Sequence, residues 1–206
     1  MRRNGASVEN NLRIQLVAFN DDLYRAWQDY FAEAEDVMVS RGDILSFKAD
    51  AIVSPANSFG YMDGGLDAKY SAFFGWQLEA RLRSVLEEYH YGELPVGQAV
   101  IVETEHQDIP YLISAPTMRV PMKVANTPNA FLAFKAVLQA VQLFNRSEQR
   151  KITSILCPGL GTGEGKMPPE RCAYQMFKAY EICLRGEVET RGGLAQAVRN
   201  HQDLLM

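Results

Sequence analysis

A glycine-rich loop between an apolar run and a proline-led helix constrains the fold more than any other feature of the sequence. Residues Lys151–Pro158 are rich in isoleucine and leucine, which is typical of a buried strand. Glycine then occupies every second position from 159 to 165, and Pro168-Pro169 precedes a helical pattern of apolar residues. Proline suits the first turn of a helix, where an N–H has no partner within the helix. The segment therefore predicts a strand, a tight loop and a helix in an α/β protein.

Strands and helices are predicted to alternate along the rest of the chain. Arg13–Phe19, Ala51–Val53 and Tyr111–Ala115 are short apolar runs that predict strands. Helical patterns lie between these runs, and we expect Asn129 to cap one of the helices. The alternation predicts one three-layer α/β/α domain over residues 12–185, with a mixed, mostly parallel central sheet.

The two ends of the chain have a different composition from the predicted domain. Residues 1–11 are polar and lack the apolar core of a signal peptide, so we expect a flexible tail. The chain turns polar and glycine-bearing again after Arg185, and we expect residues 186–206 to be a C-terminal segment of uncertain order.

Composition excludes several classes of function. The 206 residues are 47% hydrophobic and 22% charged, which is a globular balance, and a net charge of −4 argues against duplex nucleic acid as a partner. No run approaches the ~18 apolar residues of a membrane helix. The three cysteines and three histidines lack metal-ligand spacing, so we expect no metal site and reduced thiols, which are typical of a cytoplasmic protein.

The glycine loop has the composition of a phosphate cradle. Glycine lets backbone N–H groups turn toward a ligand, and the helix that follows adds a preference of ~0.3–1 kcal/mol for an anion. A P-loop is excluded because Met167, and not Ser or Thr, follows Lys166. The dinucleotide fingerprint fails because Glu164 or Lys166 stands where its last glycine must be. The structural alternative is a tight turn without a ligand.

A second set of polar and glycine residues follows the strands predicted in the first third of the chain. A carboxylate at a strand end, such as Asp43, accepts a hydrogen bond from an exocyclic amine, and Asn57 suits the hydroxyls of a ribose. Gly64-Gly65 is a second place where backbone can approach a ligand. Structural alternatives are a cap for Asp43 or Asp67, an Asx turn for Asn57 and a chain reversal for the glycines.

Together these motifs resemble the macro domain, the ADP-ribose-binding module, over residues 41–180. The family's opening pattern is similar to Gly42-Asp43-Ile44, then to Asp50–Asn57, and then to Gly64–Asp67 in this chain. The later glycine loop of the family is similar to Gly161–Lys166. The resemblance implies the same α/β/α architecture and a nucleotide diphosphate ligand.

The resemblance also implies a role for each motif. Asp43 would hold the adenine amine with help from the Ile44 N–H, Asn57 would contact the distal ribose, and the two glycine segments would grip the diphosphate. Asp67 matches the aspartate with which MacroD-like members position or activate a water. The implied reaction, which needs no metal or other cofactor, is cleavage of an ADP-ribosyl bond or of an acetyl ester on ADP-ribose. The implied catalytic residues are Asp67 and Asn57, and the implied ligand-binding residues are Asp43, Ile44, Asn57, Gly64, Gly65, Leu66, Gly159, Leu160, Gly161, Thr162, Gly163, Glu164 and Gly165.

The chain departs from the family pattern at several positions. Ser54 stands where the family has its first asparagine, and the first glycine run has two members in place of three. Gly165 stands where many members carry an aromatic residue that covers the distal ribose. Phe59, Tyr61 or Met167 could provide that cover. These departures make binding a firmer expectation than catalysis.

Three functions are therefore compatible with the sequence. The first is a hydrolase that releases ADP-ribose from a modified protein carboxylate or a related conjugate, with ADP-ribose or an ADP-ribosylated protein as the partner. The second is a non-catalytic ADP-ribose reader or an accessory module of a larger assembly. The third is a macro-like shell that binds another nucleotide or nothing.

The strand and helix predicted within residues 13–31 precede the family pattern, and we expect them to add an edge strand.

Overall fold

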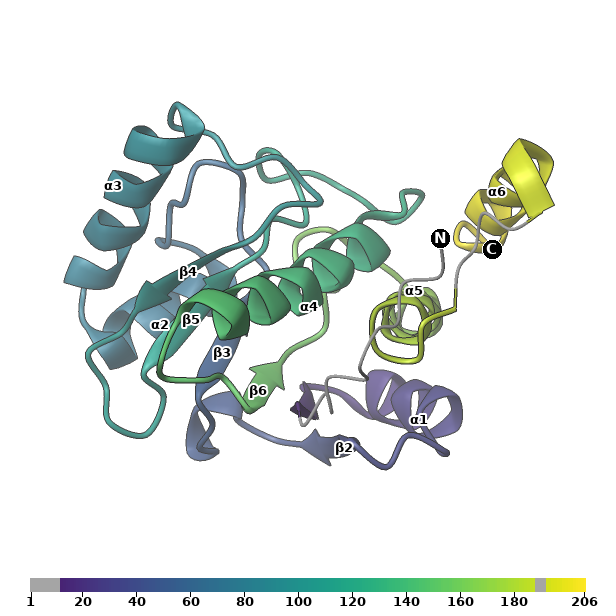
Figure 1. Ribbon diagram of the computed structural model, residues 1–206, viewed down its shortest axis with the longest axis horizontal. Coiled ribbons are helices and arrows are strands. Elements are labelled where there is room, and N and C mark those ends of the chain that lie inside the picture. Colours follow the sequence, from purple (N-terminus) through teal and green to yellow (C-terminus); the bar gives the residue numbers. More distant parts are fainter. Residues whose placement is uncertain (1–11, 188–191) are drawn as a thin grey trace.

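A six-stranded sheet with helices on both faces organises the chain, for which a computed structural model describes residues 12–187 and 192–206 (Figure 1). The tail predicted at residues 1–11 lies outside the described residues. The strands are β1 (Arg13–Ala18), β2 (Val37–Arg41), β3 (Ala51–Ser54), β4 (Val100–Glu103), β5 (Tyr111–Ser114) and β6 (Ser154–Cys157). The helices are α1 (Asp21–Tyr30), the short 3-10 helix η1 (Ile44–Ser46), α2 (Gly65–Phe74), α3 (Gln77–His90), α4 (Asn129–Ser147), α5 (Pro169–Leu184) and α6 (Gly193–Asp203).

The sheet order is β2-β1-β6-β3-β5-β4. All neighbouring pairs are parallel except β4 and β5, so the predicted mixed, mostly parallel sheet is confirmed. The expected position of the first strand is wrong, because β1 lies between β2 and β6 and the edge strand is β2. Leu16 and Val17 pack into the clusters on opposite faces of the sheet, as expected for an interior parallel strand.

Two apolar clusters, one on each face of the sheet, form the core. Residues of β3 alternate between them: Ala51 and Val53 pack with α1, α4 and α5, whereas Ile52 packs with α2 and α3. Figure 1 accordingly shows α2 and α3 on one side of the molecule and α1, α4 and α5 on the other. This is the three-layer α/β/α arrangement predicted from the sequence.

Asp50, which belongs to the family-like motif, joins β3 to β6. Its Oδ2 accepts hydrogen bonds from the backbone N–H and the hydroxyl of both Thr153 and Ser154, at 2.8–3.1 Å. Burial raises the pKa of Asp50, but these hydrogen bonds outweigh it and lower the pKa below its ordinary value. Asp50 lies at the start of its strand and therefore has a structural role at the edge opposite the strand ends.

The sequence left the order of residues 186–206 uncertain. The structure has helix α6 in this segment, and residues 188–191 lie outside the described part. Gln175 on α5 donates to the carbonyl of Leu204 at 2.7 Å, and Arg171 donates to the carbonyl of Met206 at 3.0 Å. Figure 1 shows α6 beside α5 at an outer corner of the molecule. Among the described helices, none is long and apolar enough to cross a bilayer.

Candidate functional site

The loops that follow the parallel strands gather at one edge of the sheet, because parallel strands end on the same side. The loop after β3 pairs with the loop after β5 through a bridge between Asn57 and Met118. The loop after β5 in turn meets the loop after β6, where Val124 N–H donates to the Gly165 carbonyl at 2.7 Å. Ligands in open α/β sheets bind at this edge. The family-like residues around Asp43, Asn57, Asp67 and Gly161 all lie on these loops or directly after them.

The loop after β6, residues 158–168, is called the glycine loop below, and its glycines have two different functions. A Cβ on Gly165 would lie 2.5 Å from both the Gly161 carbonyl oxygen and Val124 Cγ2, and one on Gly159 would lie 2.6 Å from Leu23. These positions are glycine because the loop packs closely against its neighbours. A Cβ on Gly163 would meet nothing within 4 Å, so this part of the loop is open.

The glycine loop carries a run of backbone donors without partners. Among the described residues, the N–H groups of residues 161–165 donate to no other group of the chain, although the next two, of Lys166 and Met167, donate to carbonyls within the loop. Gly161 has a φ of +72°, which the absence of a Cβ permits. Five consecutive N–H groups without partners, with the exposed Gly163 and Glu164 among them, form the type of donor surface that binds phosphate. Of Leu160, only the backbone is available, because its side chain is fully buried.

The second glycine segment, Gly64–Leu66, forms the start of α2. Gly64 is the N-cap residue and provides no side chain to bind the first turn, and Gly65 has a φ of +57°. A Cβ on either glycine would meet nothing within 4 Å. The positive end of α2 is therefore accessible, with the donors of its first turn available to an anion.

Asp43 and Ile44 occupy the corner after β2. The exposed Asp43 carboxylate accepts a hydrogen bond from Leu45 N–H at 3.1 Å and thereby caps η1. The structural interpretation of Asp43 as a cap is therefore confirmed, and its second oxygen accepts no hydrogen bond from another described residue. The Ile44 side chain is buried, while its N–H donates to no described residue. One acceptor and one donor thus lie side by side at this corner.

Asn57 forms the Asx turn that was the structural alternative for it. Its Oδ1 accepts from the backbone N–H of Phe59 at 3.0 Å and of Tyr61 at 3.4 Å, and its Nδ2 donates to the Tyr61 carbonyl at 2.8 Å. The acceptor capacity of the side chain is therefore in use within its own loop. One N–H of the Asn57 amide remains available for a ligand.

Asp67 is the third residue of α2 and is directed inward, toward the end of β3. It is 8% exposed, and Ser54 Oγ donates to its Oδ1 at 2.6 Å. Burial raises the pKa of Asp67 to about 6, the Ser54 hydrogen bond opposes that rise, and the charge of Glu79 adds to it. Such a perturbed carboxyl at a strand end is typical of functional sites. The cap that was the alternative for Asp67 is instead the role of Gly64.

Of the three side chains that the sequence offered as a cover for the distal ribose, Phe59 and Tyr61 remain candidates and Met167 does not. Met167 is 2% exposed and belongs to the core, so it covers nothing outside. Phe59 and Tyr61 lie in the Asn57 loop, where Arg119 lies over the Phe59 ring at 5.1 Å and Arg83 over the Tyr61 ring at 4.6 Å.

The structure also shows two features that sequence reasoning missed. Phe19, directly after β1, is 85% exposed, and Lys69 of α2 lies over its ring at 5.7 Å. The available signal in the sequence was an aromatic residue directly before the cap residues Asn20-Asp21-Asp22. Asn129 is the first residue of α4 and not its cap, which is Pro128; its side chain instead donates to the Thr117 carbonyl at 2.8 Å.

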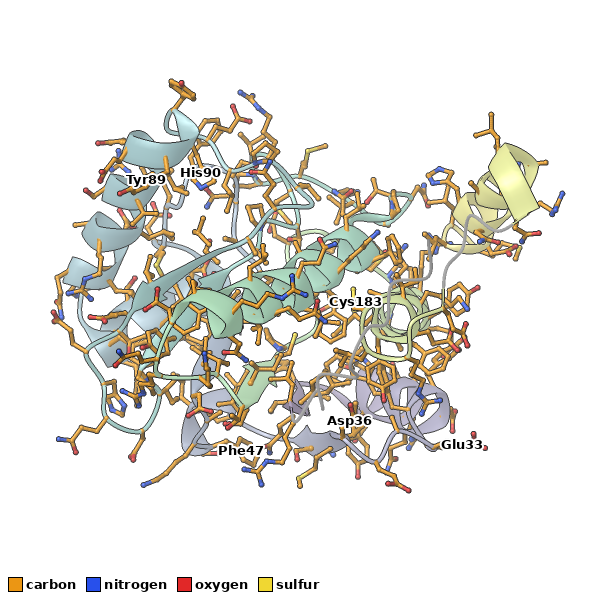
Figure 2. The ribbon with its side chains drawn as sticks, in the orientation of Figure 1. Glu33, Asp36, Phe47, Tyr89, His90 and Cys183 are labelled. Atoms are coloured by element: carbon orange, nitrogen blue, oxygen red, sulfur yellow. The ribbon has the colours of Figure 1, made fainter. Side chains whose placement is uncertain are left out.

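Cysteine and histidine residues do not gather around the site. Figure 2 shows His90 at the end of α3 and Cys183 on α5, on separate parts of the molecule. Cys157 lies at the end of β6 and is fully buried, and burial raises the pKa of its thiol well above the ordinary range. The interpretation of Cys157 as a core thiol therefore fits better than that of a nucleophile.

A mostly parallel α/β/α domain with two open glycine segments and a buried aspartate at its carboxyl edge defines the class of this chain. A model of the macro domain family matches residues 53–176, and the chain belongs to this family. An uncharacterised protein of Aquifex aeolicus is 34% identical over 143 residues, which cover 69% of this chain and 79% of that protein. A macro domain-containing protein of Cupriavidus necator is 28% identical over 139 residues, which cover 68% and 76% of the two chains.

Solved structures agree on the fold. The Oceanobacillus iheyensis macrodomain, whose structure contains ADP, has a TM-score of 0.59 at 21% identity and covers 71% of this chain and 75% of its own. The macrodomain of Mycobacterium tuberculosis DarG has a TM-score of 0.55 at 19% identity, covering 80% and 90%. The sequence resemblance to the macro domain is thereby confirmed.

Proposed function

We propose that this macro domain binds ADP-ribose at the carboxyl edge of its sheet and hydrolyses an ADP-ribosyl ester there. The observation that carries the proposal is the row of free N–H groups at residues 161–165, on the same edge as the open Gly64–Leu66 segment and the buried Asp67. Two donor surfaces around one anion suit a diphosphate better than a single phosphate. The macrodomain of O. iheyensis, solved with ADP and as a mutant with ADPR, supports this ligand class.

The proposed ligand lies with its purine at the Asp43 corner. The free Asp43 oxygen accepts from the exocyclic amine, and Ile44 N–H donates to a ring nitrogen. The glycine loop and the Gly64–Leu66 segment hold the diphosphate between them. The remaining N–H of Asn57 donates to a hydroxyl of the distal ribose, because its Oδ1 already accepts two bonds.

Asp67 is the proposed catalytic group. With a pKa of about 6, its carboxyl is mostly ionised at neutral pH and remains a better base than an ordinary aspartate. It accepts a proton from the attacking water while its charge stabilises the positive character that develops on the sugar. The products are ADP-ribose and the free acceptor carboxylate. Activity is expected to rise with pH through about 6, as Asp67 ionises.

Calorimetric titration with ADP-ribose and turnover of a mono-ADP-ribosylated protein test the proposal together. Asp67→Asn should retain binding and lose turnover. The control is Asp63→Asn, which changes an exposed aspartate just before α2 and should change neither. If the wild-type protein binds ADP-ribose without turnover, it is a reader and the catalytic proposal is wrong. If ADP-ribose does not bind, both proposals are wrong.

A further inference from the structure

Ser54 is the last residue of β3, stands where the family pattern has an asparagine, and makes a buried hydrogen bond. Its side chain lies on the same face of the sheet as Ile52, two residues earlier, and is 0% exposed. Its Oγ donates to Asp67 Oδ1 at 2.6 Å, which is a short distance typical of a hydroxyl donating to an ionised carboxylate. The contact therefore joins a rigid strand to the proposed catalytic carboxyl.

The other titratable groups around Asp67 do not favour its charged form. Glu79 on α3 raises the pKa of Asp67 by its negative charge. Tyr70, one turn further along α2, is fully buried and donates its hydroxyl to the Val53 carbonyl at 3.1 Å. Burial, followed by the neighbouring Asp67, raises the pKa of Tyr70, so its phenol stays neutral beside Asp67. Among the described side chains that act on Asp67, Ser54 is thus the one that lowers its pKa, and the first turn of α2, in which Asp67 lies, adds the general preference of a helix N-terminus for an anion.

We propose that Ser54 is a positioning residue for Asp67, holding Oδ1 so that the other oxygen faces the reacting sugar and its water. The inference rests on the proposed function, since it assigns Asp67 a reacting partner. A hydroxyl on a strand end suits this role because the backbone of β3 is fixed by pairing with both β5 and β6. Ser54 neither touches the ligand nor transfers a proton, so its effect on the reaction passes through Asp67.

Ser114 provides a matched control from the adjacent strand. It pairs with Ser54 in the parallel register of β3 and β5 and is 1% exposed. Its Oγ is buried without a hydrogen-bond partner among the described residues. Ser114→Ala and Ser54→Ala therefore delete the same atom from equivalent positions, and only the second deletion removes a contact with Asp67.

The test compares Ser54→Ala, Ser54→Thr and Ser114→Ala in two measurements. The first is the titration of the Asp67 carboxyl carbon by NMR in the ligand-free protein, and the second is the pH profile of hydrolysis. Ser54→Ala should move both the Asp67 titration and the acidic limb of the profile upward by about 1 pH unit, because a hydrogen bond to the charged form is lost. Ser54→Thr should restore both, and Ser114→Ala should leave both unchanged.

Two results would overturn the inference. One is an Asp67 titration that does not respond to Ser54→Ala, and the other is an equal response to Ser114→Ala, which would indicate a general effect on packing. Because the titration uses ligand-free protein, these results do not depend on the proposed function. Failure of ADP-ribose to bind the wild-type protein would instead refute the proposed function.

Discussion

Replacing Asp67 by asparagine is expected to stabilise the protein at neutral pH. The carboxyl is 8% exposed and burial raises its pKa from the ordinary 3.8 to about 6. At about 1.4 kcal/mol for each pKa unit, the ionisation of Asp67 lowers the free energy of unfolding by about 3 kcal/mol. Asparagine keeps an oxygen that accepts from Ser54 and carries no charge. Asp67→Asn should therefore raise the free energy of unfolding at pH 7.5 by up to about 3 kcal/mol.

The pH dependence gives the sign of this effect. A raised pKa in the folded state contributes stability that is complete below about pH 4 and is lost as pH rises through about 6. The difference between the variant and the wild type should thus be near zero at pH 4 and reach its full value above pH 7. For a chain of this length the gain corresponds to about 6–12 °C in Tm.

Denaturant unfolding of the two proteins between pH 4 and pH 8 measures the effect. Asp63→Asn is the control, and because Asp63 is exposed it should change the free energy of unfolding by no more than about 0.5 kcal/mol at any pH. The reasoning is refuted if Asp67→Asn destabilises the protein at pH 7.5, or if its advantage does not depend on pH.

Four further substitutions test other parts of the proposed site and fold. Asp43→Ala should weaken ADP-ribose binding by ~1–3 kcal/mol in calorimetry, whereas an unchanged Kd would remove Asp43 from the site. Gly165→Ala should lower the free energy of unfolding by about 1–3 kcal/mol, because its Cβ would lie 2.5 Å from two atoms, and Gly163→Ala should weaken ligand binding without that loss. Asp50→Asn should destabilise the protein by about 1–2 kcal/mol in urea at pH 7. The Asp50 contribution is present above pH 3.8 and lost as pH falls below it, so an Asp50→Asn effect that persists undiminished at pH 2 would contradict the charge-based explanation.

The architecture followed from the sequence because its signals were local. The isoleucine-rich run before Cys157, the glycine loop and the proline-led helix each specify their own backbone, and their alternation predicts a parallel sheet. Strand order is not a local property. Nothing within Arg13–Ala18 specifies that β6 pairs with its other edge, since that pairing joins residues about 140 positions apart and depends on packing of the whole sheet.

The candidate site was predictable in its composition but not in its details. The positions of Asp43, Asn57 and Asp67 in the motifs indicated that they belong together, and the strand ends bring their loops to one edge. The sequence did not reveal that Asn57 uses its Oδ1 within its own loop, or that Asp67 points inward to Ser54. Both depend on side-chain directions, which are set by the three-dimensional arrangement and not by residue type.

The glycine loop shows the same limit. Alternate glycines suggested one shared function, whereas Gly165 is fixed by contact with Val124 and Gly163 faces open space. Only the second type of position has open space where a side chain would stand. Distinguishing the two requires knowledge of the neighbouring loop after β5, which is distant in sequence.

Amide NMR spectra recorded during titration with ADP-ribose test the central claim most directly. We predict that the signals of residues 161–165, Gly64–Leu66 and Ile44 shift together with one saturation curve, because their N–H groups contact the same ligand. Signals at α6, on the far side of α5, should stay in place. Shifts confined to other parts of the chain, or unchanged spectra at millimolar ligand, would contradict the claim that two backbone donor surfaces bind one diphosphate.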